Sequence, residues 1–206
     1  MSRELSFHKI LLHICCGPCA MWPLRSLLDS GADVTLFFYN PNIHPEMEWK
    51  RRFENAERVA GHYNLRMIVE PDNNSSAWRD REDDGDQRCR FCYETRLERT
   101  AREAAANGYD AVSTTLLVSP YQNRELLLAA GKAAADANDV SFVPFDWRDG
   151  FRKGQEMARE LGLYRQKYCG CVVSLEHSDY FETVSREHEQ LALAACLGCG
   201  GDLLRG

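Results

Sequence analysis

Short apolar runs alternate with longer amphipathic segments along most of the chain. Residues 9–14 are almost continuously apolar and stop at a Cys-Cys-Gly-Pro sequence, which is typical of a parallel strand covered on both faces. Further strand-like runs occupy residues 34–39, 65–69, 111–115 and 140–145. Helical spacing predicts helices after the first strand to about residue 30 and at 45–62, 89–107, 123–138, 149–161 and 175–195.

This alternation predicts an α/β fold, because parallel neighbouring strands need crossover connections and helices supply them. We expect a Rossmann-like, doubly wound, mostly parallel five-stranded sheet with helices on both faces. Residues 71–87 are polar and aperiodic, which predicts a mobile loop. No repeat is visible, so residues 1–195 should form a single α/β domain, followed by a Gly- and Cys-rich tail at 196–206.

The composition permits a full hydrophobic core, since 44% of the 206 residues are hydrophobic. The apolar run at 10–16 is too short for a secretion signal or a membrane span, so we expect a cytoplasmic protein without membrane association. The net charge of −6 provides no overall attraction to nucleic acid. An anionic partner would have to meet local basic clusters, such as Lys50-Arg51-Arg52, which are otherwise solvated helix faces.

Seven of the nine cysteines fall into three tight groups, each beside a predicted strand end or helix start. The carboxyl ends of parallel strands share one edge of a sheet, so these groups should converge there. Isolated buried cysteines do not cluster in this way, and disulfide scaffolds belong to short secreted domains. The groups that predict a metallocluster or a dithiol redox centre are Cys15-Cys16-x-x-Cys19, Cys89-x-x-Cys92 and Cys169-x-Cys171.

The first two groups admit more than one chemistry. Cys16-Gly-Pro-Cys19 has the spacing of a thiol-disulfide exchange site at a helix start, as in thioredoxins. Four thiolates suit a 4Fe-4S cluster or an all-cysteine zinc site, and the candidates are Cys15, Cys16, Cys89 and Cys92. The adjacent pair favours the cluster, because neighbouring cysteines strain one tetrahedral ion but can reach different irons of a cube.

The Cys169-Gly170-Cys171 group suits an electron relay, because a disulfide in so small a ring would be strained and easily reduced. Ligation of a second metal and inert burial are the alternatives. Cys196 and Cys199 repeat the C-x-x-C spacing near the end of the chain, where such a pair more often has no function.

Two further side chains are candidates for proton transfer. His44 follows a strand end, although a loop histidine is more often simply hydrogen-bonded. Asp146 could act as an acid or ligate a metal, or it could cap the next helix. The sequence has no G-x-G-x-x-G, and Gly131-Lys132 lacks the upstream glycine of a Walker loop, so ATP and NAD are not implied.

Five stretches together resemble the cobalamin-independent epoxyqueuosine reductase family, QueH type. They lie within about residues 9–185 in the family's order: ILLHICCGPC at 10–19, FFYNPNIH at 37–44, CRFCYETRL at 89–97, STTLLVSPYQN at 113–123 and QKYCGC at 166–171. The resemblance implies a Rossmann-like domain with a 4Fe-4S cluster. It also implies an oxidoreductase that reduces epoxyqueuosine at the tRNA wobble position to queuosine, the last step of that modification.

The family pattern also implies residue roles. The implied cluster ligands are Cys15, Cys16, Cys89 and Cys92. The implied redox-active pair is Cys169 and Cys171. Relatives with a second iron beside the cluster suggest Cys19 as a ligand there, whereas Cys196 and Cys199 lie outside the resemblance. The electron donor and the oligomeric state do not follow from the sequence.

Removal of an epoxide oxygen to leave an alkene takes two electrons and two protons and releases water. An iron centre with an open position could polarise the oxygen, while a nearby acid supplies protons. The candidate proton donors, in no set order, are His44, Tyr39 and Asp146. The RNA base must leave its loop to reach such a pocket, where aromatic side chains can stack on it and cations meet phosphates.

The candidates for base contacts are Tyr39, Tyr121, Gln122 and Trp147, and those for phosphate contacts are Arg148, Arg152 and Lys153. Two rival functions remain at this point. One is a thioredoxin-like oxidoreductase that uses Cys16 and Cys19, and the other is a non-catalytic, zinc-stabilised RNA-binding module. Analysis of bound iron, sulfide and zinc separates all three.

Overall fold

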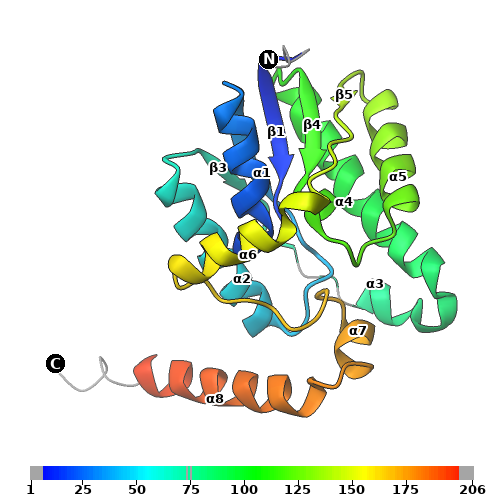
Figure 1. The fold of residues 1–206 in the computed structure, drawn as a ribbon. Helices are drawn as coiled ribbons and strands as arrows, with labels where there is room; N and C mark the ends of the chain where they lie inside the picture. Colours follow the sequence, from blue (N-terminus) through cyan, green and yellow to red (C-terminus); the bar gives the residue numbers. More distant parts are fainter. Residues whose placement is uncertain (1–6, 73, 75, 200–206) are drawn as a thin grey trace, which may run out of the picture.

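A parallel sheet forms the centre of the molecule. The computed structural model describes residues 7–199 apart from 73 and 75, with the side chains at 192 and 195–199 also left undescribed. The strands are β1 (Lys9–His13), β2 (Asp33–Phe38), β3 (Met67–Val69), β4 (Ala111–Thr114) and β5 (Ser141–Phe142). All five are parallel and lie in the order β3-β2-β1-β4-β5 (Figure 1). The predicted α/β doubly wound fold is confirmed.

Helices cover both faces of the sheet. They are α1 (Gly17–Asp29), α2 (Glu46–His62), α3 (Ser76–Arg79), α4 (Asp86–Ala106), α5 (Arg124–Asp136), α6 (Phe151–Glu160), α7 (Val172–Glu176) and α8 (Phe181–Cys199). Helix α1 packs against α2 and α6, and α4 packs against α5. Side chains of β1 point alternately to the two faces: Ile10 and Leu12 join one buried cluster, and Leu11 joins another with Ala104 and Ala135. This two-sided burial explains the continuous apolar run.

Two elements differ from the sequence prediction in their extent. Strand β5 has two residues instead of the predicted six at 140–145; Val143 still donates from its N–H to the Val112 carbonyl at 2.9 Å, but Pro144 has no N–H to continue the ladder. The predicted helix at 175–195 is two helices, α7 and α8, with a break after Glu176. Figure 1 shows α8 along the end of the molecule toward which β1 points, where it contacts α2.

The segment at 71–87, predicted to be a mobile loop, is partly helical in the structure. It contains α3 and a 3-10 turn at Glu82–Asp84, and α4 already begins at Asp86. The anchor is Trp78, which is 1% exposed and packs on Phe91 with ring centroids 5.1 Å apart. One buried aromatic residue thus orders a segment whose other residues are polar.

The end of the chain is described only in part. Helix α8 continues through Cys196 to Cys199, so this C-x-x-C pair lies in a helical segment, but its side chains are outside the described part. Residues 200–206 of the predicted tail also lie outside it. No helix in the described ranges is both long and apolar enough to cross a membrane.

Candidate metal centre and its cavity

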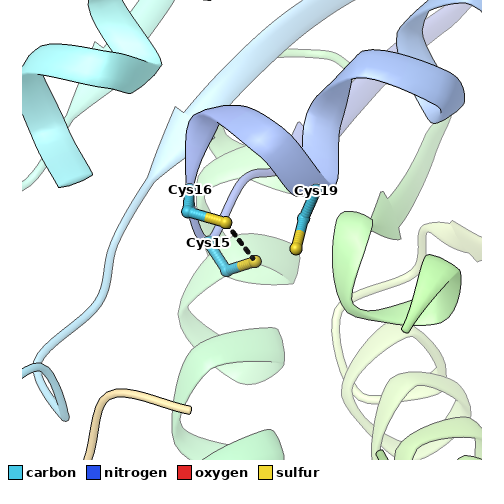
Figure 2. Close-up of side chains that lie close together, drawn as sticks. All are labelled: Cys15, Cys16 and Cys19. Atoms are coloured by element: carbon cyan, nitrogen blue, oxygen red, sulfur yellow. Dashed lines mark hydrogen bonds between the residues drawn. The ribbon is translucent and has the colours of Figure 1, made fainter. Parts of the chain in front are cut away.

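Three cysteines meet where β1 passes into α1. Cys15 follows the strand, Cys16 is the residue before the helix, and Cys19 lies in the first turn (Figure 2). Their Sγ atoms all lie within 4.8 Å of one another, and those of Cys15 and Cys16 are 3.7 Å apart. All three are buried. Such close sulfurs form a plausible donor set for a thiophilic metal ion.

Close packing of α1 on α2 positions this group. A Cβ atom at Gly17 would come within 2.8 Å of the Asn55 carbonyl oxygen on α2, so only glycine permits this approach. Pro18 occupies the first turn of α1, where a missing N–H costs nothing. The Gly-Pro between the cysteines therefore sets the direction of the helix and, with it, the positions of the sulfurs.

The three thiols differ in their affinity for protons. Hydrogen bonds from Cys16 and Cys19 hold the pKa of the Cys15 thiol well below its ordinary value. Burial raises the pKa of Cys16, and hydrogen bonding to Cys15 and Cys16 raises that of Cys19. A thiol-disulfide exchange site needs an accessible, acidic cysteine. Cys16 is neither, which argues against the thioredoxin-like function.

A second cysteine group lines a separate, smaller cavity. Cys89 and Cys92 occupy the first two turns of α4, one helical turn apart, and line a cavity of about 40 Å³ together with Cys169 and Cys171. Burial raises the pKa of both Cys89 and Cys92. A metal would have to displace their protons, because cysteine binds metals as the thiolate.

A larger cavity of about 410 Å³ adjoins the small one. Its lining residues are Cys15, Cys19, Arg52, Leu116, Ser119, Tyr121, Gln122, Phe151, Gln155, Arg165, Gln166, Lys167, Tyr168 and Cys169. Three residues line both cavities: Leu116, Gln122 and Cys169. The structure thus brings all three cysteine groups to two adjoining cavities. Six of the seven thiols line one or both cavities, and the seventh, Cys16, lies against Cys15.

Cys169 and Cys171 form a dithiol in this structure. Their Sγ atoms are 3.8 Å apart, compared with about 2.05 Å in a disulfide. Hydrogen bonding from Cys171 lowers the pKa of the Cys169 thiol, and the Ser174 N–H donates to the Cys171 sulfur at 3.4 Å. A thiol with a depressed pKa at the wall of a cavity is the reactive member of such a pair.

A buried ion-pair network holds this loop in place. Arg52 donates to the carbonyl oxygens of Cys169 at 2.9 Å and Tyr168 at 3.0 Å, and its Nε donates to Glu48 at 2.7 Å. Glu48 also accepts from the hydroxyl of Tyr164 at 2.9 Å. Sequence analysis treated Arg52 as part of a solvated basic cluster. Only its position in the fold shows that it supports the dithiol loop.

Gly170 permits the turn between the two cysteines. Its φ is +126°, and a Cβ atom there would lie 2.9 Å from Arg52 Nη1. We expect Gly170→Ala to lower the free energy of unfolding by about 1–3 kcal/mol, measured by denaturant titration of chelator-treated protein. Gly61→Ala in α2 is the matched control, because its Cβ meets nothing within 4 Å and alanine favours a helix. Equal stability of the two variants would contradict the prediction.

The predicted proton donors do not line either cavity. The Tyr39 hydroxyl donates to Asp72 at 3.2 Å, and burial raises its pKa to about 12. The backbone carbonyl of His44 accepts from the Tyr168 hydroxyl, and burial lowers the pKa of its imidazole. Asp146 accepts from Arg148 at 2.8 Å, which holds its pKa at about 2. An ionised Asp146 is a poor acid, and its role as a proton donor stays a prediction.

The side chains predicted to contact RNA differ in how exposed they are to solvent. Tyr121 is 83% exposed, lines the larger cavity beside Gln122 and packs edge-on against Phe151. Tyr39 and Trp147 are only 8% and 4% exposed, so neither presents its ring at the surface of this structure. Arg152 and Lys153 are exposed and directly follow Phe151, whereas Arg148 is paired with Asp146 and lies outside both cavities. Two further cations, Arg165 and Lys167, form a local basic cluster in the sequence and line the larger cavity.

A further polar network lies behind the cysteines. His13 contacts Thr114 through Nδ1 at 2.8 Å and the Tyr39 carbonyl through Nε2 at 3.1 Å. Burial and the neighbouring Arg96 lower the pKa of His13 to about 3. Gln166 donates to the Cys16 sulfur at 3.0 Å. The family-like stretches contain His13, Arg96 and Gln166, but the sequence alone does not show that they surround thiols.

Comparison with known proteins agrees with this geometry. Residues 10–177 match the family described as "Epoxyqueuosine reductase QueH". Relatives of that name include proteins of Dehalococcoides mccartyi, 35% identical over 81% of this chain and 92% of the relative, and Thermotoga maritima, 36% identical over 86% and 96%. A third, from Acinetobacter baylyi, is 36% identical over 83% and 82%. With a family match over most of its length and several such relatives, this chain belongs to the epoxyqueuosine reductase QueH family.

Proposed function

We propose that this chain reduces the epoxide of epoxyqueuosine at the tRNA wobble position to the alkene of queuosine. The family and the printed name of its relatives support this reaction. The structural observation that carries the proposal is the pair of adjoining cavities, lined by cysteines from three separate parts of the chain. The larger cavity, about 410 Å³, is of the size that binding sites for small ligands have, so an extruded base fits the proposal.

We assign a 4Fe-4S cluster to this site, held by Cys15, Cys16, Cys89 and Cys92. Cys19 remains for a second iron, which its place beside Cys15 and Cys16 supports. When bound, such iron centres supply single electrons and a Lewis acid for the epoxide oxygen. These thiols would hold the centre, and the apolar side chain of Leu116 lines both cavities beside them.

The dithiol of Cys169 and Cys171 can supply the electrons and protons that the reaction consumes. Oxidation of two thiols to a disulfide releases two electrons and two protons, and the epoxide needs both pairs to become an alkene and water. Cys169 lines both cavities, which supports a role beside both the proposed cluster ligands and the proposed base site. An external reductant must then restore the dithiol. This route also supplies protons without His44, Tyr39 or Asp146.

The function is tested by purification without oxygen, followed by analysis of iron, acid-labile sulfide and zinc. We expect a brown protein with iron and sulfide that converts epoxyqueuosine to queuosine in tRNA, measured by nucleoside mass spectrometry after digestion. A colourless, zinc-containing protein that binds tRNA without converting it would favour the RNA-binding module. A metal-free protein with thiol exchange activity would favour the thioredoxin-like function.

Tyr121 is our candidate for stacking on the extruded base. Base stacking on an aromatic residue contributes about 1–3 kcal/mol, so Tyr121→Ala should weaken tRNA binding by about fivefold to 150-fold. The measurement is a filter-binding titration with epoxyqueuosine-containing tRNA. Phe181→Ala is the control, since Phe181 is also exposed but does not line either cavity. Equal affinity of both variants would remove Tyr121 from the base site.

Exposed cations that line the larger cavity or follow its lining residue Phe151 in the sequence are our candidates for phosphate contacts. They are Arg152, Lys153 and Arg165, which are exposed. Replacement of each by Ala should lower the slope of log K against log salt by at most about one unit. Arg148→Ala is the matched control, because Asp146 already compensates that charge. If Arg148→Ala reduces the slope and the other three do not, the RNA follows a different path across the surface.

A further inference from the structure

Arg96 is a buried cation without a carboxylate partner. It lies in α4, is 4% exposed, and forms no ion pair with any carboxylate in the described ranges. One terminal nitrogen donates to the Asn40 side-chain oxygen at 2.6 Å, and the other lies 3.7 Å from the Cys92 sulfur. Its Nε is 3.4 Å from His13 Nε2. The side chain is therefore surrounded by neutral polar groups and thiols.

The other buried arginine of the site is paired with a buried carboxylate. Arg52 is 2% exposed, but its Nε donates to Glu48 at 2.7 Å, so its charge is balanced by a buried carboxylate. Arg96 has an amide and an imidazole where Arg52 has Glu48. Burial of an unpaired charge is costly, and buried charges in proteins are paired or bind metal centres. The charge of Arg96 therefore needs an anion that its carboxylate-free surroundings do not supply.

The acidic groups nearest to Arg96 are thiols that we assign to the cluster. The Cys92 sulfur lies 3.7 Å from a terminal nitrogen of Arg96. Cys15 follows two residues after His13, the last residue of β1, and Arg96 also contacts His13. A thiolate-bound iron cluster carries net negative charge, and reduction adds one more. A fixed guanidinium beside it stabilises the more negative state more strongly, because the Coulomb energy grows with the charge.

We propose that Arg96 is the built-in counter-ion of the metal centre, and that its charge raises the reduction potential of the cluster. This inference rests on the proposed function, because it places the cluster at Cys15, Cys16, Cys89 and Cys92. Arg96 acts as a positioning and charge-balancing residue behind the cluster and lines only the smaller cavity. The permanent charge of arginine suits this role, since it does not deprotonate as the cluster changes its own charge.

The test is the one-electron reduction potential of the cluster in wild type, Arg96→Gln and Arg96→Lys, measured by redox titration followed by electron paramagnetic resonance. We expect Arg96→Gln to disfavour reduction by about tenfold or more, which is about 60 mV lower for one electron. Arg96→Lys should recover most of the shift. The control is Arg99→Gln on the same helix, whose charge Glu70 and Glu103 balance outside the site. Equal potentials in wild type and Arg96→Gln would overturn the proposal.

A thermal melt distinguishes charge balance from a merely structural role. With the cluster bound, Arg96→Gln should lower Tm relative to wild type, because the anionic centre loses its counter-ion. After chelation, the difference should shrink or change sign, because the variant no longer buries an unpaired charge. An equal loss in both states would mean that Arg96 only fills space. If the wild-type protein binds no cluster, the proposed function is wrong. The difference in Tm between chelated wild type and chelated Arg96→Gln still shows whether Arg96 buries an unpaired charge.

Discussion

Replacement of any one of Cys15, Cys16, Cys89 and Cys92 by alanine is expected to leave the purified protein without its full iron and acid-labile sulfide. Each cysteine supplies one thiolate, and a site with three of its four ligands binds a 4Fe-4S cluster weakly. The measurement combines the visible absorption of the anaerobically purified variants with iron and sulfide assays. Epoxyqueuosine reduction should fall to background in the same variants.

Cys19→Ala is the matched control, because Cys19 lies in the same sulfur group but is not one of the four assigned ligands. We expect this variant to keep its sulfide and to lose at most the second iron. Full iron and sulfide in two of the four ligand variants would contradict the assignment. Loss of the cluster in Cys19→Ala, with retention in Cys89→Ala, would move the ligand set toward the β1–α1 junction.

The double variant Cys169→Ser, Cys171→Ser is expected to keep iron and sulfide but to stop turnover with a physiological reductant. The two sulfurs lie 3.8 Å apart beside the second cysteine group, and serine cannot form the disulfide that balances the reaction. Iron and sulfide assays measure whether the cluster is retained, and queuosine formation measures turnover. Thiol trapping of wild type should show the pair in both reduced and oxidised forms.

Ser178→Ala serves as the control for this part of the chain, since the Ser178 hydroxyl donates to the Leu175 carbonyl at 2.8 Å and the residue supplies no thiol. It should retain both cluster and turnover. If the double serine variant instead loses iron, the two cysteines are metal ligands, and the relay is replaced by the second-iron interpretation.

The strand and helix pattern was sufficient to predict the fold class. Apolar runs such as residues 10–12 can be buried on both faces only in a parallel sheet between two helical layers. The same pattern placed Cys15 and Cys16 at a strand end, because ladder formation and the following Gly-Pro are local effects. The helical parts of the polar segment at 71–87 were not predicted, because a single residue, Trp78, anchors it through contacts with distant residues such as Val173.

The sequence by itself therefore determined the class of fold, the placement of Cys15 and Cys16 at a strand end and the family to which the chain belongs. Tertiary structure decided which groups share an environment. Arg52, Arg96 and Arg148 are the same residue type in sequence, yet the first is paired inside the core, the second is buried beside thiols, and the third is exposed beside Asp146. Burial and charge balance depend on contacts between residues far apart in the chain, and those contacts exist only after the sheet and helices have packed.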